Sequence, residues 1–308
     1  MGSVKISAVS VRQEGPFGAP VPRGADVLEL VRPLTWFPPM WAYLCGAVSA
    51  GVVWSDRWLP VLVGMALAGP LVCAASQAAN DWFDRDVDAL NEPGRPIPSG
   101  RVGGLWGLAV AVLLSAVSLP IGWVLGPWVF AATLVGLGLA WAYSAPPLRL
   151  KRDGWIGPVA CALAYEGLPW FAAAAAALGA LPPATVTAAA LLYAFGAVGI
   201  MTLNDFKALD GDRAHGLRSL PVRYGSDAAA RIACAFMIVG QLGIVILLAV
   251  IDARLAAALV ALIVLAQLPC MARLLAAPRE RAPWFNAVGT GLFVGGMMVT
   301  AIALGMPA

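Results

Sequence analysis

The amino-acid sequence predicts an all-α integral membrane protein, and two observations lead to this fold class. Hydrophobic residues make up 60% of the 308 residues, whereas Asp, Glu, Lys and Arg together make up only 12%. A soluble domain of this length needs more polar surface than these residues supply. The apolar residues also fall into long runs rich in Ala and Leu, without the period-2 alternation of a membrane β-barrel.

Nine of these runs are long enough to cross a bilayer. A hydrocarbon core about 30 Å thick requires roughly 20 apolar residues in one helix. We therefore expect transmembrane helices at 37–55, 59–79, 104–123, 127–145, 156–179, 183–204, 229–251, 254–274 and 284–305. Residues 1–36 are expected to form a cytoplasmic N-terminal segment, and residues 37–308 a single nine-helix domain.

The distribution of basic residues predicts the orientation. Of the 20 Lys and Arg residues, all but Arg57 and Arg254 fall in the N-terminal segment or in the loops that follow the even-numbered spans. Because cytoplasmic loops carry an excess of Lys and Arg, the N-terminus and these loops are expected in the cytoplasm. The basic residues follow the topology and form no separate patch, so the formal charge of +3 does not indicate a nucleic-acid partner.

An acidic motif lies where the second span ends, in the stretch NDWFDRDVDALNEPGRPIPSGR (80–101). On a helical wheel, Asp84 and Asp88 lie about 60° and about 20° from Asp81, so the three carboxylates share one face. Asn80 adds a neutral oxygen donor, whereas Asp86 points away. Carboxylates that are held together against their repulsion indicate a cation between them.

The chain repeats this motif after the sixth span, in NDFKALDGDRAHGLRSLPVRYG (204–225). The spacing of Asn80, Asp81, Asp86 and Asp88 recurs in Asn204, Asp205, Asp210 and Asp212. Arg95 follows the first motif and Arg218 follows the second at a similar distance. Ala208 stands at the position that corresponds to Asp84. The repeat predicts a duplicated helical element whose two acidic ends meet at the cytoplasmic side.

Carboxylate and amide oxygens are ligands that suit Mg²⁺ rather than zinc or copper. Magnesium is commonly held by one or two carboxylates together with phosphate oxygens of a substrate, and arginines bind the same oxygens. Two facing Asp clusters therefore indicate a bound diphosphate. The alternative is that these are ordinary solvated charges at the interface, which the repetition of the motif disfavours.

These motifs resemble a known family. Asn80-Asp81-x-x-Asp84-x-x-x-Asp88, with a second Asp-rich loop between spans 6 and 7, is similar to the two aspartate motifs of the intramembrane UbiA-type aromatic prenyltransferases. The longer strings at 80–100, 143–157 (YSAPPLRLKRDGWIG), 165–170 (YEGLPW) and 204–225 look like the chlorophyll synthase branch, and among its members they are most similar to the bacteriochlorophyll synthases of phototrophic bacteria.

The resemblance implies a fold with nine helices around a central cavity that opens sideways to lipid, and a location in the bacterial inner membrane, cytoplasmic or intracytoplasmic and photosynthetic. It implies transfer of a geranylgeranyl or phytyl group from its diphosphate to the propionate of bacteriochlorophyllide a. Partners among pigment-synthesis enzymes or light-harvesting assembly factors are an expectation by association only.

Residue roles carry over from the family by position. Asp81, Asp84 and Asp88 are expected to hold one Mg²⁺ with Asn80 in support, and Asp205 and Asp212 a second with Asn204. Arg95 and Arg218 are expected to bind diphosphate, with Lys207 or Lys151 assisting. Ala208 departs from the aspartate of much of the superfamily, which puts the coordination of the second metal in question.

Two further residues have open interpretations. Glu166 lies ten residues into the fifth span, where an unpaired charge is costly. It either binds the macrocycle or the water on its central magnesium, or is a protonated structural acid. His215 either ligates the central magnesium of the pigment or is an uninvolved loop residue.

Two alternative functions stay open on the sequence alone. The first is a prenyltransferase of the same fold that acts on 4-hydroxybenzoate, homogentisate or haem, which should lack the longer strings quoted above. The second is a cation or phosphate transporter, which would explain the internal repeat and Glu166. A transporter needs polar groups along a path through the membrane, whereas almost all charged residues here lie at one side.

Overall fold

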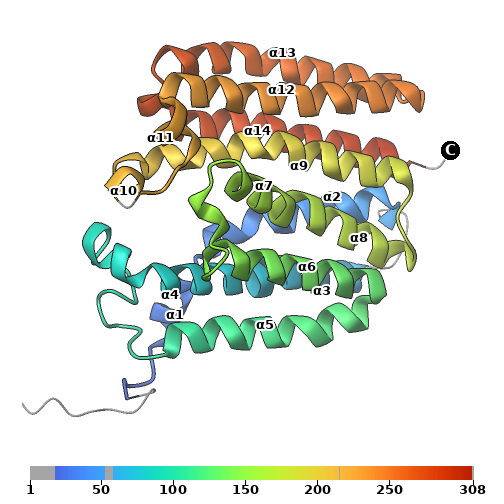
Figure 1. The fold of residues 1–308 in the computed structure, drawn as a ribbon. Coiled ribbons are helices and arrows are strands. Elements are labelled where there is room, and N and C mark those ends of the chain that lie inside the picture. Colours follow the sequence, from blue (N-terminus) through green and yellow to red (C-terminus); the bar gives the residue numbers. More distant parts are fainter. Residues whose placement is uncertain (1–17, 53–57, 215, 307–308) are drawn as a thin grey trace, which may run out of the picture.

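The protein is a bundle of long helices that lie side by side (Figure 1). The computed structural model describes residues 18–52, 58–214 and 216–306. Apart from one isolated bridge between Asp153 and Arg218, the regular structure in this part of the chain is helical. The predicted all-α fold class is therefore confirmed.

The helices follow one another with short connections. The first half contains α1 (Gly24–Leu30), η1 (Pro33–Trp36), α2 (Phe37–Ser49), α3 (Trp58–Ala66), η3 (Leu67–Cys73), α4 (Ala74–Asn91), α5 (Trp106–Leu125), α6 (Pro127–Ser144), η4 (Leu150–Arg152), α7 (Ile156–Ala162), η5 (Leu163–Gly167) and α8 (Leu168–Leu178). The second half contains α9 (Ala184–Asn204), η6 (Asp205–Lys207), α10 (Leu209–Ala214), α11 (Leu220–Tyr224), α12 (Ser226–Val250), α13 (Arg254–Ala276) and α14 (Pro278–Gly305).

Eight helical segments of the described chain are long and apolar enough to cross a membrane. They are Trp58–Leu90, Trp106–Leu125, Pro127–Ser144, Ile156–Leu178, Ala184–Lys207, Ser226–Val250, Arg254–Ala276 and Pro278–Gly305. The expected count of nine is not confirmed, because the first expected span forms α2, a helix of 13 residues. At 1.5 Å per residue, α2 is about 20 Å long, which is shorter than the hydrocarbon core.

Two of the long helices contain a widened π-helical turn. The segment η3 joins α3 to α4, and it includes Pro70, which has no N–H to donate and whose ring crowds the carbonyl one turn earlier. Widening the helix at this point relieves that conflict. The second widened turn, η5, lies between α7 and α8 and contains Glu166.

Glycines allow the helices to pack at very short distances. A Cβ atom at Gly46 of α2 would lie 2.1 Å from the carbonyl oxygen of Trp170 in α8. A Cβ atom at Gly199 of α9 would lie 2.2 Å from the carbonyl oxygen of Ala233 in α12. Since helices in lipid associate through close packing rather than the hydrophobic effect, these contacts hold neighbouring helices of the bundle together.

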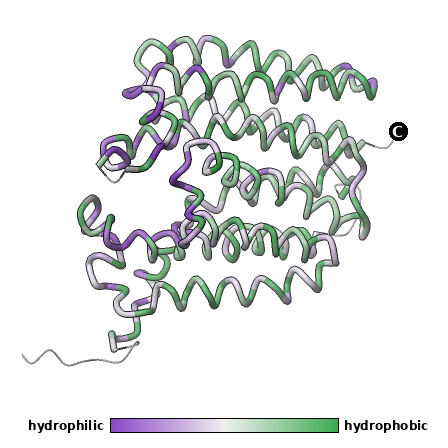
Figure 2. Tube along the Cα trace, in the orientation of Figure 1, coloured by the Kyte–Doolittle hydropathy of each residue, from purple (hydrophilic) through white to green (hydrophobic). Residues whose placement is uncertain are grey.

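Hydrophilic residues gather at one end of the bundle, where α10, α11 and the C-terminal end of α4 lie (Figure 2). The first acidic motif belongs to the end of α4, and the second begins at the end of α9 and continues through α10. The fold therefore brings the two motifs to the same end, as the sequence predicts.

We expect Gly46→Ala to lower the free energy of unfolding by about 2 kcal/mol, because the added methyl group forces α2 and α8 apart. Thermal unfolding of the purified protein in detergent measures this change. Gly138→Ala is the matched control, since a Cβ atom at Gly138 of α6 meets nothing within 4 Å. Equal stability of the two variants would show that the α2–α8 contact does not depend on Gly46.

Candidate active site

A cavity of about 490 Å³ lies inside the bundle, with walls from both halves of the chain. Its lining includes residues of α2, α4, α6, η4, η5, α9 and α14. Five of the residues predicted for the site line it directly, namely Asn80, Lys151, Glu166, Asn204 and Asp205. The other predicted residues are not part of the lining: Asp81, Asp84, Asp88, Arg95, Lys207, Asp212 and Arg218.

Asp81 is the most buried carboxylate of the first motif, with only 1% of its side chain exposed. Arg32 Nη2 donates to its Oδ1 at 2.5 Å. Arg95 Nη1 lies 3.7 Å from the same oxygen and donates to Asp88 Oδ2 at 2.7 Å. A carboxylate this deeply buried requires a cation beside it, and the chain supplies two.

Asp84 has a separate set of basic partners. Arg149 Nη2 donates to its Oδ1 at 3.1 Å, and Lys151 Nζ forms an ion pair with its Oδ2. Asn80 Nδ2 also donates to Asp84 Oδ2 at 3.1 Å. Burial lowers the pKa of Lys151, and the neighbouring Asp84 carboxylate opposes this shift. The charge on Lys151 therefore depends on the carboxylate beside it.

Asp205 of the second motif has a different environment. Asp205 lines the cavity and forms no ion pair with a basic residue of the described chain. It lies close enough to Asp212 for the two carboxylates to repel each other, and Asp212 Oδ2 accepts a hydrogen bond from Ser219 at 2.7 Å. Asn204 Oδ1 accepts a hydrogen bond from Asn286 of α14 at 2.8 Å.

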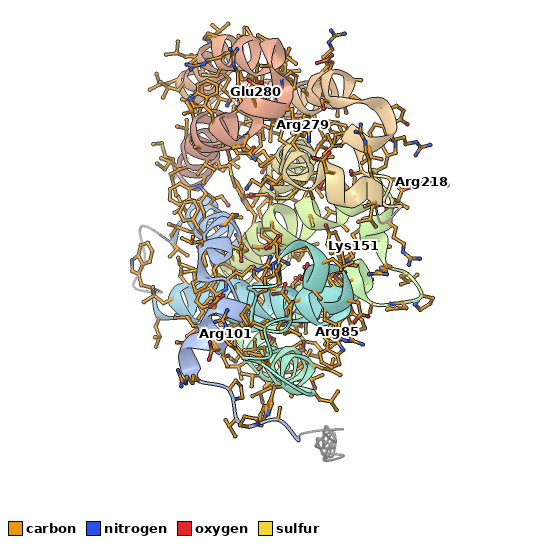
Figure 3. All side chains as sticks on the ribbon, turned by 90° about the vertical axis from the view of Figure 1, so that its left-hand side faces the viewer. Arg85, Arg101, Lys151, Arg218, Arg279 and Glu280 are labelled. Carbon is orange, nitrogen blue, oxygen red and sulfur yellow. The ribbon has the colours of Figure 1, made fainter. Side chains whose placement is uncertain are left out.

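The basic residues predicted near the second motif lie further out. Lys207 and Arg218 are exposed. The backbone of Arg218 is fixed, because its N–H donates to the Arg152 carbonyl at 3.1 Å. When the bundle is viewed from its polar end, Arg218 lies toward the edge and Lys151 nearer the middle (Figure 3).

Each motif also contains an exposed aspartate, and for Asp86 this agrees with the helical wheel. The side chain of Asp86 is 92% exposed. Asp210, the corresponding residue of the second motif, is 73% exposed and pairs with Arg279. These two residues point away from the cavity.

The donor set of the polar end suits a hard cation. Within the described residues, no three His, Cys, Asp or Glu side chains form a ready-made metal cluster. Magnesium does not need one, since one or two carboxylates and the substrate's own phosphate oxygens complete its shell. Oxygen donors from both motifs, Asn80, Asn204 and Asp205, line one cavity. The residues present therefore fit Mg²⁺ bound together with a diphosphate.

Sequence reasoning missed several residues of the site. Arg32 has a left-handed backbone (φ 48°) at the start of η1, and this places its side chain beside Asp81. The sequence offers no signal for this contact, because the two residues are 49 positions apart. Arg149 and Asn286 were missed for the same reason. The predicted role of His215 lies outside the described residues.

The interior end of the cavity is apolar except for a few hydrogen-bonding groups. Tyr165 and Glu166 line it from η5, and Gln77 lines it from α4. Gln77 Nε2 donates to the Tyr165 hydroxyl at 2.9 Å. The side chain of Glu166 is buried, and its Oε2 has no hydrogen-bond partner.

A helical membrane bundle with such a cavity defines a class of enzyme. Cations and oxygen donors at one end suit an anionic head group, and the apolar interior suits a lipid-soluble body. The arrangement is that of an intramembrane enzyme that acts on an apolar substrate with an anionic end.

Comparison with known proteins identifies the family. The sequence pattern of the UbiA prenyltransferase family matches residues 36–301. The chain is 55% identical over 284 residues to the bacteriochlorophyll synthase 33 kDa chain of Cereibacter sphaeroides, covering 92% of this chain and 94% of the relative. It is 38% identical over 289 residues to the chloroplastic chlorophyll synthase of Arabidopsis thaliana, covering 90% of this chain and 73% of that protein.

The fold is also shared with solved structures. The structure of a UbiA homologue from Archaeoglobus fulgidus bound to DMAPP and Mg²⁺ superposes with a TM-score of 0.69 at 20% identity, covering 90% of this chain and 99% of the other. The chain belongs to the UbiA prenyltransferase family, and it is a membrane-embedded prenyltransferase.

The ion pair between Arg32 and Asp81 gives a testable expectation. The Arg32→Ala substitution leaves the buried carboxylate of Asp81 with only the more distant Arg95 as a cationic neighbour. The substitution should therefore lower the free energy of unfolding by about 3 kcal/mol. Asp81→Asn in the same background should restore much of this loss, because no unpaired charge remains. Thermal unfolding of the two single variants and the double variant measures the coupling. If the losses in free energy of unfolding of the two single variants add up to the loss of the double variant, Arg32 and Asp81 are not coupled and the assigned ion pair is wrong.

Proposed function

We infer that this protein is a bacteriochlorophyll synthase. It transfers a geranylgeranyl or phytyl group from its diphosphate to the propionate carboxylate of bacteriochlorophyllide a and releases diphosphate. The observation that carries this proposal is the 55% identity to the Cereibacter sphaeroides protein, which extends over 92% of the chain. The cavity supports it, because basic side chains and oxygen donors at its polar end suit a diphosphate and most of its remaining lining is apolar.

The reaction forms a bond between a propionate oxygen and the allylic C1 carbon of the prenyl group. The bond between C1 and the diphosphate oxygen breaks, and its electron pair leaves with the diphosphate. Mg²⁺, when bound, stabilises the negative charge that develops on this leaving group. The acceptor is already ionised at neutral pH, so the protein need not supply a strong base.

The proposed residue roles follow the two motifs. Asp81, Asp84 and Asp88 with Asn80 would hold one Mg²⁺, and Asp205 and Asp212 with Asn204 a second. Arg95, Arg218, Lys151 and Lys207 would bind the diphosphate, and Glu166 would contact the acceptor. Support comes from the cavity lining, where donors of both motifs and Lys151 face the same space.

The remaining expectations belong to the same proposal. We place the protein in the cytoplasmic or intracytoplasmic photosynthetic membrane of a bacterium, with the N-terminus and the polar end of the cavity in the cytoplasm. Residues 37–308 would form the catalytic domain and residues 1–36 a cytoplasmic segment. Pigment-synthesis enzymes or light-harvesting assembly factors would be its protein partners.

The decisive assay supplies the purified protein with bacteriochlorophyllide a, geranylgeranyl diphosphate and Mg²⁺, with chlorophyllide a and 4-hydroxybenzoate as competing acceptors. We expect esterified bacteriochlorophyllide, detected by chromatography. EDTA should abolish the product, and added Mg²⁺ should restore it. Prenylation of 4-hydroxybenzoate alone would overturn the proposed acceptor but not the family.

Substitutions in the second motif test the metal roles. Asp205→Asn should lower kcat/KM by about 100-fold, because it removes a charged oxygen donor beside the leaving group. Asp210→Asn is the matched control, since this exposed aspartate of the same motif pairs with Arg279 outside the cavity. The same assay at several Mg²⁺ concentrations measures both. Equal activity of the two variants would remove Asp205 from the metal site.

A further inference from the structure

The transfer step proposed above does not use Glu166. It lies ten residues after Ile156, where α7 begins, and therefore about 15 Å along the helix axis from the polar end. It nevertheless lines the same cavity as Asn80, Lys151 and Asp205. A group in this position contacts a part of the substrate that is remote from the reacting carboxylate.

The surroundings of Glu166 favour a neutral carboxylic acid. Only 5% of the residue is exposed, its Oε2 has no hydrogen-bond partner, and no Lys or Arg of the described chain forms an ion pair with it. A charge without a partner at this depth costs several kcal/mol, whereas the neutral acid presents one O–H donor. An unused donor in a cavity wall is free to bond to an acceptor on a ligand.

The backbone holds this donor in place. The widened turn η5 brings two successive residues, Tyr165 and Glu166, to the cavity wall. The Tyr165 hydroxyl oxygen accepts hydrogen bonds from Gln77 Nε2 and Cys73 Sγ, at 2.9 Å and 3.4 Å, which fix the position of this side chain. π-helical turns of this kind are frequent at functional sites. Glu166, in contrast, has a buried carboxyl oxygen without a hydrogen-bond partner.

We propose that Glu166 selects the acceptor by donating a hydrogen bond to the acetyl carbonyl of the bacteriochlorophyllide a ring. This inference rests on the function proposed above. The macrocycle is largely apolar, so a deep anchor must be a neutral acceptor, and a ring carbonyl has that chemistry. Chlorophyllide a carries a vinyl group at the position of the acetyl group. A vinyl group cannot accept a hydrogen bond from Glu166, so the buried acid stays unpaired when chlorophyllide a is bound. Glu166 therefore disfavours chlorophyllide a as the acceptor.

The test uses acceptors that differ only at this position. The full-length protein in lipid nanodiscs receives geranylgeranyl diphosphate, Mg²⁺ and either bacteriochlorophyllide a or its 3-vinyl analogue. The variants are Glu166→Leu, which removes the donor, and Glu166→Gln, which keeps an N–H donor. Gln241→Leu is the control, since Gln241 is also buried without hydrogen-bond partners but lies outside the cavity lining.

We expect the unsubstituted protein to prefer the acetyl acceptor in kcat/KM by about tenfold over the vinyl analogue. Glu166→Leu should abolish this preference, while Glu166→Gln and Gln241→Leu should keep it. Resonance Raman spectra of bound bacteriochlorophyllide a should show the acetyl C=O stretch at lower frequency in the unsubstituted protein than in Glu166→Leu, as a hydrogen-bonded carbonyl requires.

Three results would overturn the proposal. One is an unchanged preference in Glu166→Leu. Another is a loss of the preference for the acetyl acceptor when the central magnesium is removed from both acceptors. That result would assign Glu166 to the water on the magnesium instead. The third is an acetyl C=O stretch of bound bacteriochlorophyllide a in the unsubstituted protein at the frequency of a free carbonyl. This measurement tests the hydrogen bond even if Glu166→Leu does not fold. Absence of any esterified product from the unsubstituted protein would overturn the proposed function as well.

Discussion

The structure depends on neutralising carboxylates that are buried at the end of a membrane bundle. An unpaired charge in such a place costs several kcal/mol, so each buried aspartate of the first motif needs a cation. The cations come from segments far apart in the sequence: Arg32 from the N-terminal segment, Arg95 from the loop after α4, and Lys151 from η4. The same ion pairs therefore fix three connecting segments around the mouth of the cavity, and they place basic groups where an anionic substrate would bind.

The two acidic motifs are repeated in sequence but differ in environment. The first is surrounded by basic side chains, whereas Asp205 in the second faces the cavity without an ion pair among the described residues. Each buried carboxylate of the first motif is paired with a basic side chain, whereas no basic side chain of the described residues neutralises Asp205.

Irregular backbone interrupts two of the long helices, and one of the two widened turns lines the cavity. The widened turn η3 accommodates Pro70, and the widened turn η5 brings Tyr165 and Glu166 to the cavity wall together. Close glycine contacts elsewhere, as between Gly46 of α2 and Trp170 of α8, keep the remainder of the bundle tightly packed. Tight packing and local widening together leave an internal space without loosening the bundle.

The sequence by itself determined the all-α membrane fold, the end of the bundle that carries charge, and the aspartates of both motifs, because hydropathy and motif spacing are local properties of the chain. It also placed Glu166 inside a span. Only the tertiary structure decided which cation meets which carboxylate, as with Arg32 and Asp81 or Lys151 and Asp84. It likewise showed that the first expected span forms the 13-residue helix α2 within the described residues, and that a buried oxygen of Glu166 has no hydrogen-bond partner. These features arise from contacts between distant segments and from local changes in helix geometry, which a linear pattern does not record.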